Sequence, residues 1–212
     1  NAKLSKKDYL SEYGINNTKK NITIMLSKKL YIDNKPKYLT CHNLFYNNLM
    51  NLRKNLSQDY NIFIRVHPQP EERRLPLSDE VKKSYFISKD YHFNEVMQYS
   101  DCIIIPMWTS ICEQAYLTET PILAIDCDEP SWFQDRTHKL KINYKEYLYG
   151  QRVEFNDFIK NSNDKIKNIL DWDKSKYKYN LNHFYFGDTK KYNMEEKNKI
   201  ISEKLVNFIE KC

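Results

Sequence analysis

Four short apolar runs, separated by segments of helical character, constrain the fold of this 212-residue chain most strongly. They are NITIML (21–26), YNIFIRV (60–66), DCIII (101–105) and PILAID (121–126). Apolar runs of this length are typical of strands that are buried on both faces of a parallel sheet. Strands and helices alternate along the chain with short connections. This order predicts an α/β fold: a Rossmann-like parallel sheet with helices on both faces.

Helices are predicted where apolar residues recur at a spacing of three or four. The expected segments are 4–13 with a stop at Gly14, 37–56 after Pro36, 92–100 with Asn94 as N-cap, 109–117 capped by Thr109 or Ser110, 154–172 and 193–210. SYFIS (84–88) is expected to add a short strand. The pattern is clearest in the first two thirds of the chain. We therefore expect a Rossmann-like domain at 1–150 and a helical C-terminal extension at 151–212, packed on the same domain.

The composition narrows the class of protein. Hydrophobic residues make up 41% of the chain, and no apolar run approaches the roughly 20 residues that cross a bilayer. The formal charge of +6 comes from lysines along the whole chain, without the arginine and aromatic patches of a nucleic-acid surface. We expect no nucleic-acid partner, whereas an anionic ligand or peripheral membrane contact is compatible with the charge. The five cysteines lack metal-ligand spacing and fit a reducing cytoplasm, so no metal cofactor is predicted.

The scarcity of glycine limits how this chain can hold phosphate. Its three glycines allow neither a GxGxxG dinucleotide fingerprint nor a Walker A loop. A helix N-terminus remains, where unpaired backbone N–H groups and the helix dipole favour an anion. WTSICEQA supplies one directly after DCIII, with the hydroxyls of Thr109 and Ser110 at its mouth, although ordinary N-capping explains these residues equally well. Glu113, one turn further, either accepts from sugar hydroxyls or complements the helix dipole.

RVHPQPEE (65–72) follows the second strand and contains the strongest single candidate, His67. A histidine at the carboxyl end of a strand can donate to a phosphate oxygen or protonate a leaving phosphate, and Pro68 fixes the backbone after it. The alternative is a turn histidine facing solvent. Arg65, on the same strand face, would pair with phosphate or with an internal carboxylate. Ligands of parallel sheets bind beyond the carboxyl ends of strands, so we expect the ends of 60–66 and 101–105 to lie side by side and share one ligand.

These motifs, in their order, carry a family resemblance. RVHP followed by FNEVMQYSDCIIIPMWTSICEQAYLTETPILAID resembles the C-terminal, donor-binding half of GT-B glycosyltransferases of bacterial surface and capsular polysaccharides. It is similar to the group with an HP motif and a later S/T-S motif: sialyltransferases, Kdo transferases and CDP-glycerol glycerophosphotransferases. The matching positions are His67 and Pro68, then Thr109 and Ser110, then Glu113 to Ala115 with Pro121. The match covers about residues 15–130, with Thr120 in place of the usual glycine and Thr-Ser in place of Ser-Ser.

The resemblance implies a function and roles for these residues. It implies that 1–150 is a nucleotide-donor-binding domain, in which His67 contacts the donor phosphate and assists departure of the nucleotide. Thr109 and Ser110 would hold the phosphate of a donor of the cytidine type, activated by CMP or CDP. The acceptor would be a polysaccharide or glycolipid, at the inner face of the cytoplasmic membrane.

The same resemblance implies that a second domain is needed. A complete GT-B enzyme has two Rossmann-like domains, with the acceptor and usually the catalytic base on the N-terminal one. This chain has room for the second domain only, and it begins at Asn1 without a leader sequence. We therefore expect either part of a longer transferase, which the internal-looking start favours, or a stand-alone remnant of one. The alternatives are a non-catalytic Rossmann-like binding or assembly module, and half of a nucleotide-sugar epimerase.

Overall fold

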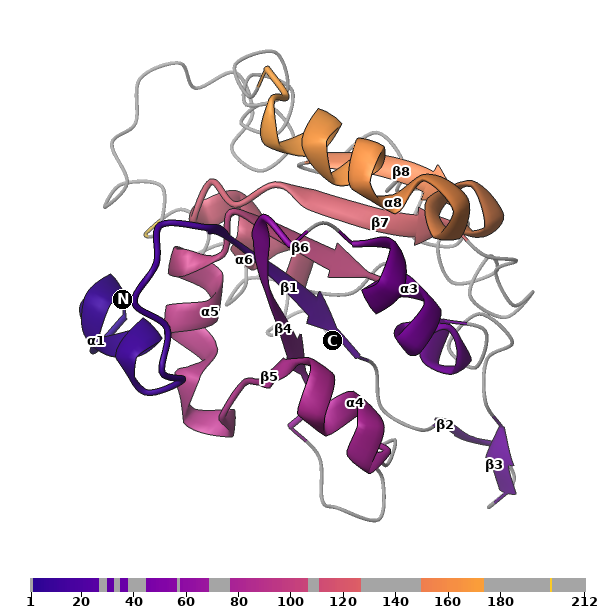
Figure 1. The fold of residues 1–212 in the computed structure, drawn as a ribbon, viewed down its shortest axis with the longest axis horizontal. Helices are drawn as coiled ribbons and strands as arrows, with labels where there is room; N and C mark the ends of the chain where they lie inside the picture. Colours follow the sequence, from indigo (N-terminus) through magenta and orange to yellow (C-terminus); the bar gives the residue numbers. More distant parts are fainter. Residues whose placement is uncertain are drawn as a thin grey trace.

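The fold is a parallel sheet of six strands, shown in Figure 1. The computed structural model describes residues 2–26, 30–32, 35–37, 45–56, 58–68, 77–106, 111–126, 150–173 and 199. The sheet contains β1 (Lys20–Met25), β4 (Tyr60–Arg65), β5 (Phe86–Ile87), β6 (Cys102–Ile105), β7 (Ile122–Asp126) and β8 (Gly150–Glu154), in the order β5-β4-β1-β6-β7-β8. All neighbouring strands in this sheet run parallel. The predicted α/β, Rossmann-like class is thus confirmed.

Helices cover both faces of the sheet, also as predicted. On one face lie α1 (Lys6–Ser11), α5 (Phe93–Tyr99) and α6 (Ile111–Leu117). On the other lie α3 (Leu49–Asn55), α4 (Asp79–Ser84) and α8 (Phe155–Leu170). Figure 1 shows α5 and α1 together on one side and α3, α4 and α8 on the opposite side. We call these the α5 face and the α3 face.

Alternation along the strands divides the core between these two faces. In β1, Ile22 and Ile24 are fully buried and belong to the cluster on the α3 face. Thr23 and Met25 point the other way, because successive side chains of a strand alternate. In β6, Ile103 and Ile105 pack on the α5 face, whereas Cys102 and Ile104 pack on the α3 face. Burial on both sides explains why these strands appear in the sequence as unbroken apolar runs.

The strand order creates a switch point beside β1. The chain passes from β1 outward to β4 and β5, and then returns to form β6 on the other side of β1. This is the order of the classic dinucleotide-binding sheet, in which ligands bind outside the carboxyl ends of the strands where the direction reverses. In this chain the reversal lies between β1 and β6.

Capping and glycine residues fix several element ends. Ser5 caps α1 by accepting from the Asp8 N–H at 3.2 Å, and Gly14, with φ of +69°, ends the turn that follows, as predicted. Gly150 is required for a different reason. A Cβ atom there would lie 1.8 Å from the carbonyl oxygen of Ile122, so β7 and β8 can pair only around a glycine.

Several predicted boundaries need correction. Lys37, expected to begin a helix, lies in β3 (Lys35–Lys37), which pairs antiparallel with β2 (Leu30–Ile32); helical residues of that segment are described only from 45 onward. Asn94 is not the N-cap of α5, because a 3-10 turn (Asp90–His92) leads into the helix and His92 takes the cap position. The predicted strand 84–88 is reduced to β5, since Ser84 is the last residue of α4.

Two further elements, β8 and α8, belong to the C-terminal part of the chain. The boundary expected between 150 and 151 falls inside β8, a strand of the same sheet. The helix predicted at 154–172 is present as α8, which contacts α3, β7 and β8. The helix predicted at 193–210 lies outside the described residues except for Lys199. None of the helices within the described ranges is long and apolar enough to span a membrane.

Candidate functional site

His67 lies where the sequence predicted, just beyond the carboxyl end of β4. β4 ends at Arg65, and His67 follows after one residue. Its imidazole is half-buried, with Nδ1 shielded from solvent, and Pro68 after it is exposed. The chain therefore holds one edge of the ring against the protein, while the next residue, Pro68, is exposed to solvent. Such a position suits a group that meets a ligand at the edge of the sheet.

The other predicted site residues, Thr109, Ser110 and Glu113, follow β6, and β6 is not a neighbour of β4 in the sheet. β6 ends at Ile105, followed by the buried Pro106, and α6 begins at Ile111. Thr109 and Ser110 fall in this connection and lie outside the described residues. Glu113 is within α6, but its side chain is outside the described part of the structure as well.

The expectation that the ends of β4 and β6 lie side by side is therefore wrong, because β1 runs between them. Met25 of β1 aligns with Arg65 of β4, and Ile24 aligns with Ile104 of β6. Two strand spacings, about 10 Å, separate β4 from β6. A ligand that contacts the carboxyl ends of both β4 and β6 must therefore extend across the end of β1.

Arg65 is tightly engaged within the protein. Its side chain is 4% exposed, and its guanidinium donates to the main-chain carbonyls of Lys89 and Asp90, each at 3.0 Å, and to the Ser88 hydroxyl at 3.5 Å. The guanidinium carbon lies 5.1 Å from the centre of the Phe93 ring. These contacts join the end of β4 to the segment that follows β5.

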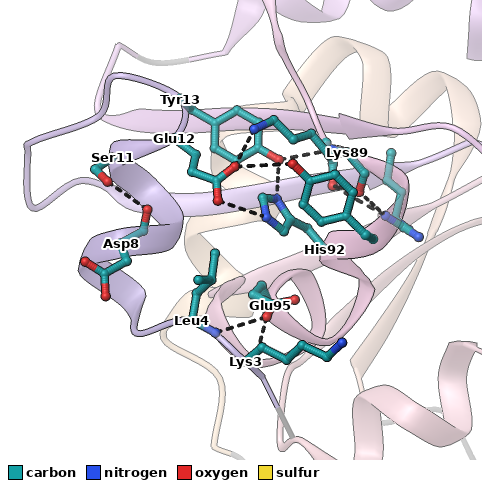
Figure 2. A network of polar contacts seen from close by, with 12 residues as sticks. Lys3, Leu4, Asp8, Ser11, Glu12, Tyr13, Lys89, His92 and Glu95 are labelled. Carbon is teal, nitrogen blue, oxygen red and sulfur yellow. Dashed lines mark hydrogen bonds and ion pairs between the residues drawn. The ribbon is translucent and has the colours of Figure 1, made fainter.

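A polar network that the sequence did not predict adjoins Arg65 on the α5 face, and Figure 2 shows it from close by. His92, only 2% exposed, places Nδ1 at 2.9 Å from the Tyr13 hydroxyl and Nε2 at 3.5 Å from Oε1 of Glu12. The same Tyr13 hydroxyl accepts from the Lys89 N–H at 3.1 Å. The Lys89 ammonium pairs with Glu12 and lies 5.7 Å from the ring centre of Tyr91. This network ties the end of α1 to the segment that Arg65 holds.

The charges of this network stabilise one another. The hydrogen bond from Lys89 holds the pKa of the Glu12 carboxyl below its usual value, and the same bond raises the pKa of the Lys89 ammonium. Both groups are thus charged at neutral pH. Glu12 is 30% exposed and Lys89 41%, so solvent weakens the pair, and its role is geometric more than energetic.

Glu95 anchors the N-terminal segment on the same face. Its side chain is 2% exposed, and Oε1 accepts from the backbone N–H groups of Lys3 at 2.7 Å and Leu4 at 3.2 Å. Burial raises the pKa of the Glu95 carboxyl, but these N–H donors outweigh it, so the pKa lies below its usual value. The buried carboxylate is therefore charged and satisfied by hydrogen bonds.

The described residues offer little to a metal ion. No group of three or more His, Cys, Asp or Glu side chains comes together within the described ranges in a way that could hold one. Cys102 is fully buried, as expected of a small core residue, and the other four cysteines fall outside the described side chains.

Among the comparisons with known proteins, only the solved structures give matches, and these concern the fold. No known family profile matches the sequence, and no curated protein sequence matches it. Among solved structures, the wall teichoic acid polymerase TagF superposes with a TM-score of 0.52 at 20% identity, covering 94% of this chain and 48% of TagF. A TagF variant gives 0.56 at 19% identity, covering 97% and 48%. The same variant, soaked with CDPG, gives 0.53 at 20% identity, covering 94% and 48%.

These likenesses define a class of fold. The described sheet with its two helical layers has a Rossmann-like α/β fold, which is consistent with one half of a GT-B fold. At about 20% identity the likeness concerns the fold alone. The chain spans about half the length of the TagF chains that it matches.

Proposed function

We propose that this chain is the donor-nucleotide-binding part of a glycosyltransferase or glycerophosphotransferase, which transfers a sugar or polyol phosphate from a CMP- or CDP-activated donor to a surface polysaccharide or glycolipid. The observation that carries the proposal is the position of His67, just past the end of β4 and one strand from the switch point of a Rossmann-like sheet. The fold shared with TagF, of which one variant was soaked with CDPG, supports the same class of donor. The proposed location is the cytoplasm, at the inner face of the membrane.

In the proposed reaction the residues after β4 and those after β6 have different roles. Transfer from a CMP-sugar, or of a polyol phosphate from a CDP-polyol, breaks a bond to the phosphate of CMP, and CMP leaves with the bonding electron pair. A protonated imidazole at His67 would give its proton to the leaving phosphate oxygen, or neutralise its charge by a hydrogen bond. Pro68 restricts the backbone of His67 to extended conformations, which holds the ring in place.

The remaining contacts are proposed for the β6–α6 connection. The hydroxyls of Thr109 and Ser110 would donate to phosphate oxygens, and Glu113 would accept from sugar hydroxyls. These residues precede or begin α6, which starts at Ile111 after the buried strand β6. The acceptor and its general base would belong to a second Rossmann-like domain. Transfer itself is therefore proposed for the complete enzyme and nucleotide binding for this chain.

Calorimetric titration of the folded chain with CMP, CDP and UDP tests the proposal. We expect the cytidine nucleotides to bind more tightly than UDP. Absence of binding of all three at millimolar concentration, with the chain demonstrably folded, would contradict the donor-site assignment and favour a non-catalytic module.

A pair of histidine variants separates a ligand from a structural residue. His67→Ala should weaken CDP binding while leaving the melting temperature nearly unchanged, and in the complete enzyme it should lower turnover by about 10²- to 10⁴-fold. His92→Gln is the matched control, because His92 is buried in the Tyr13 and Glu12 network and should affect stability in preference to affinity. Equal loss of stability and activity in His67→Ala would instead indicate a structural histidine.

A further inference from the structure

Arg65 is a buried cation, and its hydrogen-bond partners indicate its role. Arg65 is only 4% exposed, and a buried guanidinium is tolerated only when its N–H groups are satisfied, because burying an uncompensated charge is costly. Both of its terminal nitrogens donate to main-chain carbonyls, of Lys89 and of Asp90, and the rigid fork of arginine matches two acceptors at once. The Phe93 ring covers the guanidinium at 5.1 Å. These contacts direct the charge into the protein.

The backbone of Arg65 is fixed from the opposite side. Its carbonyl oxygen accepts from the Leu26 N–H at 2.8 Å, which continues the pairing of β4 with β1. On the other edge of β4, the Ser88 N–H donates to the carbonyl of Ile64 at 2.8 Å. The last residue of β4 is therefore held by β1 through its main chain and by the segment after β5 through its side chain.

Little freedom remains between Arg65 and the imidazole of His67. Only Val66 separates them, and Val66 is itself half-buried against the core of the α3 face. Pro68 confines the backbone of His67 to extended conformations. A shift at Arg65 is thus transmitted to His67 over two residues that have few alternative conformations.

We infer that Arg65 is a positioning residue, which sets the place of His67 by clamping the end of β4 to the main chain of residues 88–90, and is not a ligand of the donor phosphate. This inference rests on the proposed function only in so far as His67 binds the donor. The clamp itself consists of the contacts of Arg65 described above.

A double-mutant cycle on CDP affinity tests the inference. Arg65→Met should weaken CDP binding on the order of tenfold when His67 is present, and less than about twofold in a His67→Ala chain, since coupled residues show non-additive effects. A direct phosphate ligand would cost the same factor in both backgrounds, and that result would overturn the inference. Unchanged affinity in both backgrounds would overturn it as well.

Arg53→Met is the matched control. Arg53 also donates to a main-chain carbonyl, that of Ser84 at 3.0 Å, and lies 5.9 Å from the ring of Tyr85. It is located in the last turn of α3, which leads into the opposite end of β4. Its removal should lower stability with little change in CDP affinity in either background.

A second readout does not need the nucleotide. The imidazole resonance of His67, assigned by its loss in His67→Ala, should shift in Arg65→Met and stay in place in Arg53→Met; an unmoved resonance in Arg65→Met would overturn the clamp. If the unmodified chain binds no cytidine nucleotide, the proposed function fails and this resonance alone decides the role of Arg65. If Arg65→Met does not fold, the same measurements are made on Arg65→Lys. A lysine ammonium cannot donate to the carbonyls of Lys89 and Asp90 in the geometry of the planar guanidinium.

Discussion

The two faces of the sheet are stabilised in different ways. The α3 face holds a large apolar cluster that joins Leu49, Leu52, Phe158 and their neighbours. The α5 face also has an apolar cluster, but around it lie the buried side chains of Arg65, His92 and Glu95. Apolar packing is non-directional, whereas buried charges are tolerated only in defined hydrogen-bond geometry. The α5 face is thus the one that fixes precise positions near the end of β4.

This difference separates stability from positioning. On the α3 face the volume of each buried side chain matters, because truncating any of them leaves a cavity that lowers the free energy of unfolding. On the α5 face the hydrogen-bond partners of the buried charges matter. The Glu95 carboxylate is satisfied by backbone N–H groups of the N-terminal segment, and the Arg65 guanidinium is satisfied by the main-chain carbonyls of residues 89 and 90. Variants on the two faces should therefore affect different properties.

The largest loss of stability is expected from Phe158→Ala on the α3 face. Phe158 is fully buried and stacks on Phe45, with ring centres 6.2 Å apart. The truncation should lower the free energy of unfolding by about 3–5 kcal/mol, measured by urea denaturation. The CDP affinity of the folded fraction should stay unchanged. Leu117→Ala, at a position 36% exposed, is the control with a small effect, and a loss below about 1 kcal/mol at Phe158 would contradict the packing account.

Glu95→Gln should have the next largest effect and, unlike Phe158→Ala, one that depends on pH. It weakens the charge-assisted bonds from the N–H groups of Lys3 and Leu4, at a cost of about 1.5–3 kcal/mol at pH 7. Because the folded-state pKa of Glu95 lies below its usual value, this stabilisation is present above the unfolded pKa and is lost as the pH falls through the folded pKa.

Thermal unfolding from pH 7 to pH 3 measures this difference. The gap between the unmodified chain and Glu95→Gln should narrow toward acid. Gln98→Ala removes a neighbouring contact, to the N–H of Ala2 at 3.2 Å, without removing a charge, and should show no such narrowing. A gap that is constant with pH would mean that the Glu95 carboxylate does not stabilise the fold through its charge.

The smallest effects should come from two buried serines, one on each face, and they should have opposite signs. Ser162 in α8 is 1% exposed, and no described residue forms a hydrogen bond with its Oγ atom. Ser162→Ala should raise the free energy of unfolding by up to about 1 kcal/mol. Ser100 is buried on the α5 face and lies 2.7 Å from the Thr23 hydroxyl, so Ser100→Ala should lower it by about 1 kcal/mol. Chemical denaturation of both variants under the same conditions measures the two changes in the free energy of unfolding. Changes of the same sign would contradict the stated difference between the two faces.

The central strands and the fold class could be predicted from the sequence because burial on both sides leaves an unbroken apolar run. α4 and β8 could not be found this way. α4 has six residues and buries only Val81, too few for a helical period, although Ser78 does cap it. In β8, a strand at the edge of the sheet, only Gly150 and Val153 are buried. Short or edge elements give a weak apolar signal even where the sheet requires them.

The place of His67 in the fold could be predicted from the sequence, whereas the arrangement of the strand ends around it could not. Because ligands of parallel sheets bind beyond the carboxyl ends of strands, the residues after β4 and β6 were predicted as site residues, and His67 follows β4 and is half-buried. The order along the chain did not reveal that β1 separates these strands. The contact between Tyr13 and His92 joins residues 79 positions apart, and no local pattern signals such a pair.

A crystal structure of the chain with CDP would test the central claim most directly. We predict that the phosphates lie across the carboxyl end of β1, within hydrogen-bond distance of His67 on one side and of the connection that precedes Ile111 on the other. Arg65 should keep its bonds to the carbonyls of Lys89 and Asp90. CDP bound elsewhere, or phosphates paired with Arg65 while His67 remains distant, would contradict this account.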